Sequence, residues 1–265
     1  MQLEIRLFAT LKDRAGQNRV SLTLAGPDVT VQEMLEKLAA ADPALAPSLP
    51  TSLVAVNRQY ATPDTAIQPG DEIALFPPVS GGSGEEESEQ SIVSSDQYSK
   101  LETRNSKLDP HPFPTYFALT EEKPDLNAIH AHLVQPDVGA IATFSGYVRG
   151  ATQRDGLPPE TLHLEYEAYS EMAEQRMAQI AQEIWQKWPL VKGIAIVQRI
   201  GKLEISEPTT LVACSAGHRD QGIFEAARYG IDRLKEIVPV WKKEVGADKS
   251  VWVEGHYHPT EADNL

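Results

Sequence analysis

The chain has 265 residues, a formal net charge of −14, 41% apolar residues and one cysteine, Cys214. This length favours two domains, and a single cysteine excludes an internal disulfide framework. An acidic chain is poorly suited to nucleic acid, no apolar run reaches the ~18 residues of a membrane span, and the first residues lack a signal-peptide pattern. We therefore expect a cytoplasmic protein with no nucleic-acid or membrane partner.

Residues 1–82 show the pattern of a small α+β domain. Apolar and polar residues alternate over 3–7 and 20–24, which predicts two strands. Thr30 and Glu33 form a capping box, so a helix should begin after Thr30. Two further strands are predicted at 53–56 and 72–76, and the segment ends in the tail PPVSGG. One helix packed on a sheet fits this order.

Residues 83–114 are rich in Ser, Glu and Pro and lack apolar periodicity. Such a segment buries too little apolar surface to offset its ordering entropy, so it is predicted to be a linker.

Residues 115–265 form a second α+β segment. Strands are predicted at 139–144, 161–169, 194–200, 209–214 and 251–257, with helices at 170–188 and 220–237. Cys214 ends a strand and is predicted to be a buried core residue. His256 and His258 share a strand face, but no further ligand stands at a suitable spacing, so no metal site is expected.

Gly81 and Gly82 end the tail of the first domain. Without side chains, two glycines can thread a narrow channel and bring a carbonyl deep into another site. The domain, including Phe8 and the ending ALFPPVSGG, resembles the small subunit of molybdopterin synthase, a ubiquitin-like β-grasp sulfur carrier. That resemblance implies that an E1-like enzyme adenylylates the terminal glycine, Gly82, which then becomes a thiocarboxylate.

Basic residues follow the ends of several elements in the second segment. Arg149 follows a strand, His218 and Arg219 precede a helix, and Lys235 lies near that helix's end. Lys242 lies seven residues beyond Lys235, so the two would share a face if the turn past Pro239 stayed helical. Each residue alone is more typical of a solvated surface, but together they indicate an anion-binding pocket.

This segment is similar to the large subunit of molybdopterin synthase over most of its length, including RIGKL at 199–203, DRLK at 232–235 and WKKE at 241–244. The resemblance implies an α/β hammerhead-type domain and a homodimer of large modules. It implies substrate binding by these residues: Tyr147, Val148, Arg149, His218, Arg219, Lys243 and Glu244. Lys235 and Lys242 are the implied catalytic residues, and Lys243 stands where the family pattern leads us to expect Arg, whose bidentate fork it lacks.

The implied reaction moves two sulfurs from Gly82 thiocarboxylates onto cyclic pyranopterin monophosphate and makes the dithiolene of molybdopterin. No separate cofactor is expected. Phe8 and Phe76 are predicted to be apolar surface residues through which the carrier docks on the large module.

One observation keeps a second interpretation open. Gly82 is joined to Ser83 by a peptide bond, whereas a thiocarboxylate needs a free carboxyl group. Either the chain is a precursor that is cut after Gly82, or the second segment uses a separate carrier. The alternative to an enzyme is a non-catalytic carrier fused to a pterin-binding scaffold, inactive unless cut. An engineered linker would fit GGSG but fits the irregular remainder of 83–114 poorly.

Overall fold

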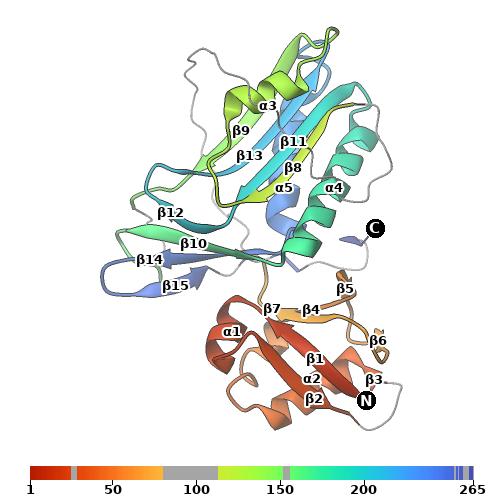
Figure 1. Ribbon diagram of the computed structural model, residues 1–265, viewed down its shortest axis with the longest axis vertical. Coiled ribbons are helices and arrows are strands. Elements are labelled where there is room, and N and C mark those ends of the chain that lie inside the picture. Colours follow the sequence, from red (N-terminus) through yellow and green to blue (C-terminus); the bar gives the residue numbers. More distant parts are fainter. Residues whose placement is uncertain are drawn as a thin grey trace.

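The computed structural model describes residues 1–24, 29–79, 113–151, 156–253, 255, 257, 258, 263 and 264. Two modules are stacked end to end along the longest axis of the molecule (Figure 1). The predicted Gly81–Gly82 ending, most of the 83–114 linker and His256 lie outside the described residues. We call residues 1–79 the carrier module and residues 113–264 the catalytic module.

The carrier module has a five-stranded mixed sheet in the order β2-β1-β7-β4-β5, in which β1 and β7 run parallel. Thr30 caps α2 as its sequence predicts, and both halves of the capping box with Glu33 are present. The helix α1 was not among the predicted elements. The elements are β1 (Gln2–Leu7), α1 (Ala9–Ala15), β2 (Arg19–Thr23), β3 (Val29–Thr30), α2 (Val31–Ala41), η1 (Leu49–Thr51), β4 (Leu53–Val56), β5 (Gln59–Ala61), β6 (Ala66–Ile67) and β7 (Ile73–Phe76).

The catalytic module has two four-stranded sheets, a main sheet ordered β8-β11-β13-β9 and a second ordered β12-β10-β14-β15. The second sheet lies between the main sheet and the carrier module (Figure 1). The elements are β8 (Thr115–Thr120), α3 (Leu126–Leu133), β9 (Ala140–Tyr147), β10 (His163–Ala168), α4 (Ser170–Lys187), β11 (Val191–Arg199), β12 (Gly201–Glu204), β13 (Pro208–Ala216), α5 (Ile223–Ile237), β14 (Val240–Val245) and β15 (Ser250–Val253).

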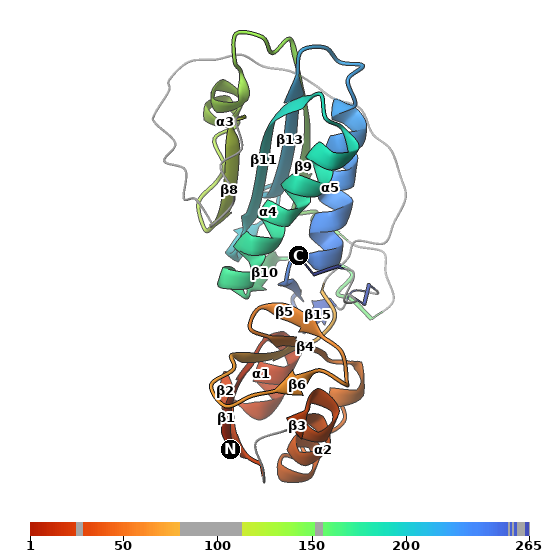
Figure 2. The same ribbon diagram turned by 90° about the vertical axis from the view of Figure 1, so that its right-hand side faces the viewer.

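Helices cover both faces of the main sheet (Figure 2). Side chains alternate along β11 and β13, so Ile194, Ile196 and Val212 pack into the large core that also contains α4 and α5. Ala195 and Leu211 point to the other face, under α3. Both sides of these central strands are therefore buried.

Several boundaries differ from the sequence-based expectation; β9, for example, ends at Tyr147 rather than 144, and β11 begins at Val191 rather than 194. The helix α5 begins at Ile223 rather than near residue 220, because residues 218–221 form the loop that leads into it. The chain past Pro239 does not stay helical but enters β14 at Val240. The last strand ends at Val253, short of the predicted 257.

An aromatic cluster joins the two modules. The Phe8 ring stacks against the rings of Tyr169 and Trp241, with centroids 5.2 Å apart in each pair. The Phe76 ring lies 5.1 Å from that of Trp241. These residues belong to one continuous buried core, so the boundary between the modules is packed like a domain interior.

Polar contacts surround this cluster. The Glu72 carboxylate accepts hydrogen bonds from the Tyr169 hydroxyl at 2.6 Å and from Arg6 at 2.8 Å. Lys12 of the carrier module pairs across the boundary with Glu167 of the catalytic module at 2.5 Å. The apolar centre with a charged rim has the anatomy of a specific protein interface.

Candidate functional site

Lys235 and Lys242 lie near each other at the end of the catalytic module that faces the carrier. Lys235 is half-buried in the last turn of α5, and Lys242 is on β14. Burial and then the charge of Lys242 lower the pKa of Lys235 to about 8. Lys235 and Lys242 are therefore close to each other, as predicted. They do not share a helix face; Lys242 comes near Lys235 because the chain enters β14 directly after Pro239.

The three residues Lys242, Lys243 and Glu244 do not point the same way, because side chains alternate along a strand. Lys243 faces the carrier module, where its Nζ lies 3.5 Å from the Asp13 carboxylate. The same Nζ lies 5.4 Å from the centre of the Trp252 ring on the neighbouring strand β15 of its own module. Its expected contact with substrate stays a prediction.

Glu244 lies on the same face of β14 as Lys242. Its carboxylate is buried and accepts a hydrogen bond from the Thr161 hydroxyl. An internal position of this kind suits a residue that shapes a site, while its contact with substrate stays a prediction.

Tyr147, Val148 and Arg149 lie at the end of β9 where Tyr147 pairs with Pro208 of β13. Val148 is buried, and its N–H donates to the Glu207 carbonyl at 2.9 Å. Tyr147 and Arg149 flank it and are exposed. The buried valine thus anchors the turn that presents both polar side chains to solvent.

His218 and Arg219 lie at the opposite end of the main sheet. Strand β13 begins at Pro208 beside Tyr147 and ends at Ala216, so eight residue steps, roughly 26 Å of strand, separate its two ends. The 15-residue helix α5, about 22 Å long, likewise separates Arg219 from Lys235. Within one chain, the structure does not bring the predicted pocket residues together.

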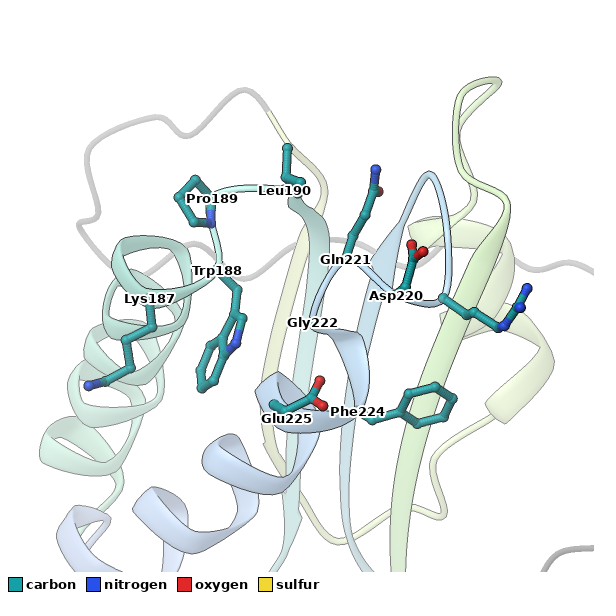
Figure 3. Close-up of a pocket in the computed structure, with 10 residues that line it drawn as sticks. Lys187, Trp188, Pro189, Leu190, Asp220, Gln221, Gly222, Phe224 and Glu225 are labelled. Carbon is teal, nitrogen blue, oxygen red and sulfur yellow. The ribbon is translucent and has the colours of Figure 1, made fainter.

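The loop that carries His218 and Arg219 opens onto a surface pocket of about 640 Å³ beside the start of α5 (Figure 3). Asp220 holds the His218 ring, with Nδ1 and Oδ1 2.6 Å apart, and this hydrogen bond lowers the pKa of Asp220. The pocket residues are Lys187, Trp188, Pro189, Leu190, Arg219, Asp220, Gln221, Gly222, Phe224 and Glu225. Apolar side chains line this pocket together with two basic residues, Lys187 and Arg219, and two acidic residues, Asp220 and Glu225.

The carrier tail runs into the catalytic module. Phe8 and Phe76, the two predicted docking residues, are both buried at the boundary. Pro77, Pro78 and Val79 are also buried, and the indole N–H of Trp241 donates to the Pro77 carbonyl at 2.9 Å. The tail rises toward β14 and the end of α5 (Figure 1). Gly82 lies outside the described residues.

Sequence reasoning missed several residues at this boundary, chiefly Tyr60, Tyr169, Arg176 and Asn264. For Tyr60 and Tyr169 the available signal was their aromatic character, because aromatic residues are enriched in protein interfaces. Asn264 carries no such signal, because one polar residue after the last strand resembles any loop residue.

Other single residues have structural positions. Cys214 is buried in β13, as predicted, and burial raises the pKa of its thiol to about 12. Within the described ranges, no three potential metal ligands gather in one place. None of the described helices is long and apolar enough to cross a membrane.

Comparison with known families separates the chain into the same two modules. Residues 119–237 match the family model described as MoaE protein, and residues 5–82 match that of the ThiS family. The chain is 45% identical over 137 residues to a molybdopterin synthase catalytic subunit of Halalkalibacterium halodurans, covering 52% of this chain and 84% of that protein. It is 38% identical over 139 residues to the corresponding subunit of Taeniopygia guttata, covering 52% and 86%.

Solved structures resemble each module separately. The structure of molybdopterin synthase from Staphylococcus aureus aligns with 56% of this chain and all of that chain, at 39% identity and a TM-score of 0.46. SAMP1 from Haloferax volcanii aligns with 31% of this chain and all of that chain, at 37% identity and a TM-score of 0.28.

Proposed function

Because the chain belongs to the molybdopterin synthase catalytic subunit family and carries a ThiS-family domain ahead of it, we propose that it transfers sulfur from its own carrier module to cyclic pyranopterin monophosphate. The chain is an enzyme of molybdenum cofactor biosynthesis. In the proposed reaction, the Gly82 thiocarboxylates of two carrier molecules each deliver one sulfur to one of two adjacent carbons, each Gly82 is left as a carboxylate, and the product carries the dithiolene.

The observation that carries this proposal is the buried carrier tail. Pro77, Pro78 and Val79 are buried. The Pro77 carbonyl accepts a hydrogen bond from Trp241, the residue directly before Lys242 on β14. A tail held in this way would deliver its glycine ending toward the lysine pair. Positioning a reactive group beside its catalytic residues replaces a costly random encounter.

Lys235 and Lys242 suit different tasks in such a reaction. With a pKa of about 8, Lys235 is partly neutral near neutral pH, so its amine is available to accept a proton or activate the substrate. Lys242 supplies the neighbouring charge, which would hold the thiocarboxylate or the substrate phosphate. Arg149, His218 and Arg219 are the proposed ligands of the phosphate and pterin.

We propose that the active form is a homodimer, because one chain separates Arg219 from Lys235 by the length of α5. Strand β9 is an edge of the main sheet, and Phe144 on it is 40% exposed. Phe224, beside the Arg219 loop, is 57% exposed. Exposed aromatic residues beside an open sheet edge favour association with another chain. A second copy would supply its His218–Arg219 loop to the lysine pair.

We further propose that the chain is cut after Gly82 before it works. A peptide bond to Ser83 blocks the carboxyl group that an E1-like enzyme must adenylylate. The packed module boundary would then hold the two pieces together. In the alternative, a non-catalytic carrier on a pterin-binding scaffold, cutting would free the Gly82 carboxyl group for loading, but the loaded carrier would give no product.

The test compares the chain before and after cutting, with intact mass measured on both samples. Protein cut after Gly82 and loaded with thiocarboxylate should convert cyclic pyranopterin monophosphate to the dithiolene product, whereas uncut chain should not. Product from a chain whose mass stays intact throughout, with no free carrier present, would rule out the precursor proposal. Loaded, cut protein that makes no product would rule out the enzymatic one.

A further inference from the structure

Tyr60 of the carrier module crosses the boundary to the helix that carries Lys235. It lies on β5, the edge strand of the carrier sheet, and its side chain is buried. The Tyr60 hydroxyl donates a hydrogen bond of 2.9 Å to the carbonyl of Ile237, the last residue of α5. The final carbonyls of a helix have no partner within the helix, so the carrier satisfies one of them.

The backbone of Tyr60 is held from the catalytic module as well. The Asn264 side-chain amide accepts from the Tyr60 N–H at 2.9 Å and donates to the Tyr60 carbonyl at 2.9 Å. A side-chain amide offers one acceptor and two donors, so it can pair with an open strand edge as a neighbouring strand would. This pairing recognises the backbone and requires an accessible edge strand.

Asn264 is presented by contacts that lie within the catalytic module. The carboxylate of its neighbour Asp263 lies 3.0 Å from the Arg233 guanidinium on α5 and accepts from the Tyr257 hydroxyl at 2.9 Å. Asp263 is therefore fixed to α5 and to Tyr257, and Asn264, the next residue, reaches the carrier.

Arg176 of α4 connects Asp263, Asn264 and the carrier. Its buried guanidinium donates to the Asp263 carbonyl at 2.7 Å, to Asn264 Oδ1 at 2.8 Å and to Gln59 Oε1 of β5 at 3.0 Å. Its Cζ also lies 5.0 Å from the centre of the Tyr60 ring, within the range of a cation–π contact. The ring, the hydroxyl and the backbone of Tyr60 are thus each contacted by a different group.

We propose that Tyr60 is the specificity-determining residue by which the catalytic module selects its carrier. The Ile237 carbonyl and Arg176 recognise its side chain, and Asn264 holds its backbone in register. The inference rests on the proposed function only in taking the docked carrier as the sulfur donor. A β-grasp carrier without a tyrosine at this position would leave the Ile237 carbonyl and one face of Arg176 short of partners. Leaving buried polar groups unpaired is costly, so such a carrier is rejected.

The test measures how fast the docked carrier leaves. A protease recognition site introduced within residues 90–100 allows the purified chain to be cut. After the cut, only the docking contacts hold the two modules together. Tyr60→Phe keeps the ring and removes the hydroxyl, and Asn264→Ala removes the backbone pairing. Each change should speed dissociation about tenfold. The increase in dissociation rate of the double variant should be smaller than the product of the two single increases, because both changes remove contacts to Tyr60.

Asn127→Ala is the matched control, since Asn127 is exposed on α3. It should dissociate at the wild-type rate. If Tyr60→Phe and Asn264→Ala also dissociate at that rate, the proposed recognition is wrong.

A kinetic comparison separates recognition from a merely structural role. With loaded carrier supplied to the cut protein, Asn264→Ala should raise KM for the carrier about tenfold and leave kcat within about twofold. A fall in kcat at unchanged KM would overturn the proposal. If loaded wild-type protein makes no product at all, the proposed function fails, but the dissociation rates still decide the role of Tyr60.

Discussion

Lys235 illustrates how one residue acquires reactivity from its surroundings. A solvated lysine is almost fully protonated at neutral pH, whereas burial in the last turn of α5 and the nearby Lys242 charge lower the pKa of Lys235 to about 8. Both causes act against the charged form. Its environment therefore makes Lys235 the most suitable general base among the predicted site residues.

We predict that Lys235→Ala lowers sulfur transfer by at least about 100-fold, the usual contribution of a positioned acid or base. The fold should survive, because a half-buried lysine on a surface helix contributes little to stability. Product formation from preloaded carrier measures the effect, and a melting curve checks the fold. Near-normal turnover by this variant would remove Lys235 from the mechanism.

The charge of Lys242 gives a second prediction, in the pH dependence. Removing a neighbouring positive charge favours protonated Lys235, so Lys242→Met should raise the Lys235 pKa above 8. If neutral Lys235 is the active form, the rising limb of the pH–rate profile should move to higher pH. A limb that stays in place would show that a different group controls it.

At the scale of elements, the end of β7 and the start of β14 make the docking contact. Phe76 is the last residue of β7, and its ring packs against Trp241 near the start of β14. The carrier tail follows directly after β7, and Lys242 follows Trp241 directly within β14. Packing at the boundary thus sets the position of both.

We predict that Phe76→Asp releases the carrier from chain cut in the linker. A fully buried ring would be replaced by a charge with no partner, which costs several kcal/mol or about 100-fold or more in affinity. Phe76 lies in the core shared between modules, whereas the carrier's own core is separate, so the released module should stay folded. Size-exclusion chromatography reports the outcome, and undiminished co-elution would contradict the prediction.

At the scale of the whole molecule, the separation of Arg219 from Lys235 leads to a prediction about mixed dimers. If each site combines the lysine pair of one copy with the Arg219 loop of another, Lys235→Ala and Arg219→Ala should each be nearly inactive alone. Co-expressed, they should regain activity, because a mixed dimer contains one site with both residues intact. An absence of recovery, with mixed dimers verified by mass, would place each complete site within one chain.

The amino-acid sequence by itself determined the features that depend on local chemistry. Alternation over 3–7 and 20–24 yielded β1 and β2, the Thr30–Glu33 capping box yielded the start of α2, and apolar spacing revealed α4. The lysines and arginines of the candidate site were also found there, because their charge is visible without a fold. Short α1 and the edge strand β5 were missed, since a few residues of weak periodicity do not stand out.

Only the tertiary structure decided which of these residues meet. Alternation along β14 turns Lys243 toward Asp13 and leaves Lys242 on the other face, near Lys235. The lengths of β13 and α5 keep His218 and Arg219 away from that pair, and Asn264 meets Tyr60 across 204 positions of sequence. Contacts of this kind arise from how rigid elements pack in three dimensions, and local residue patterns do not encode their distances.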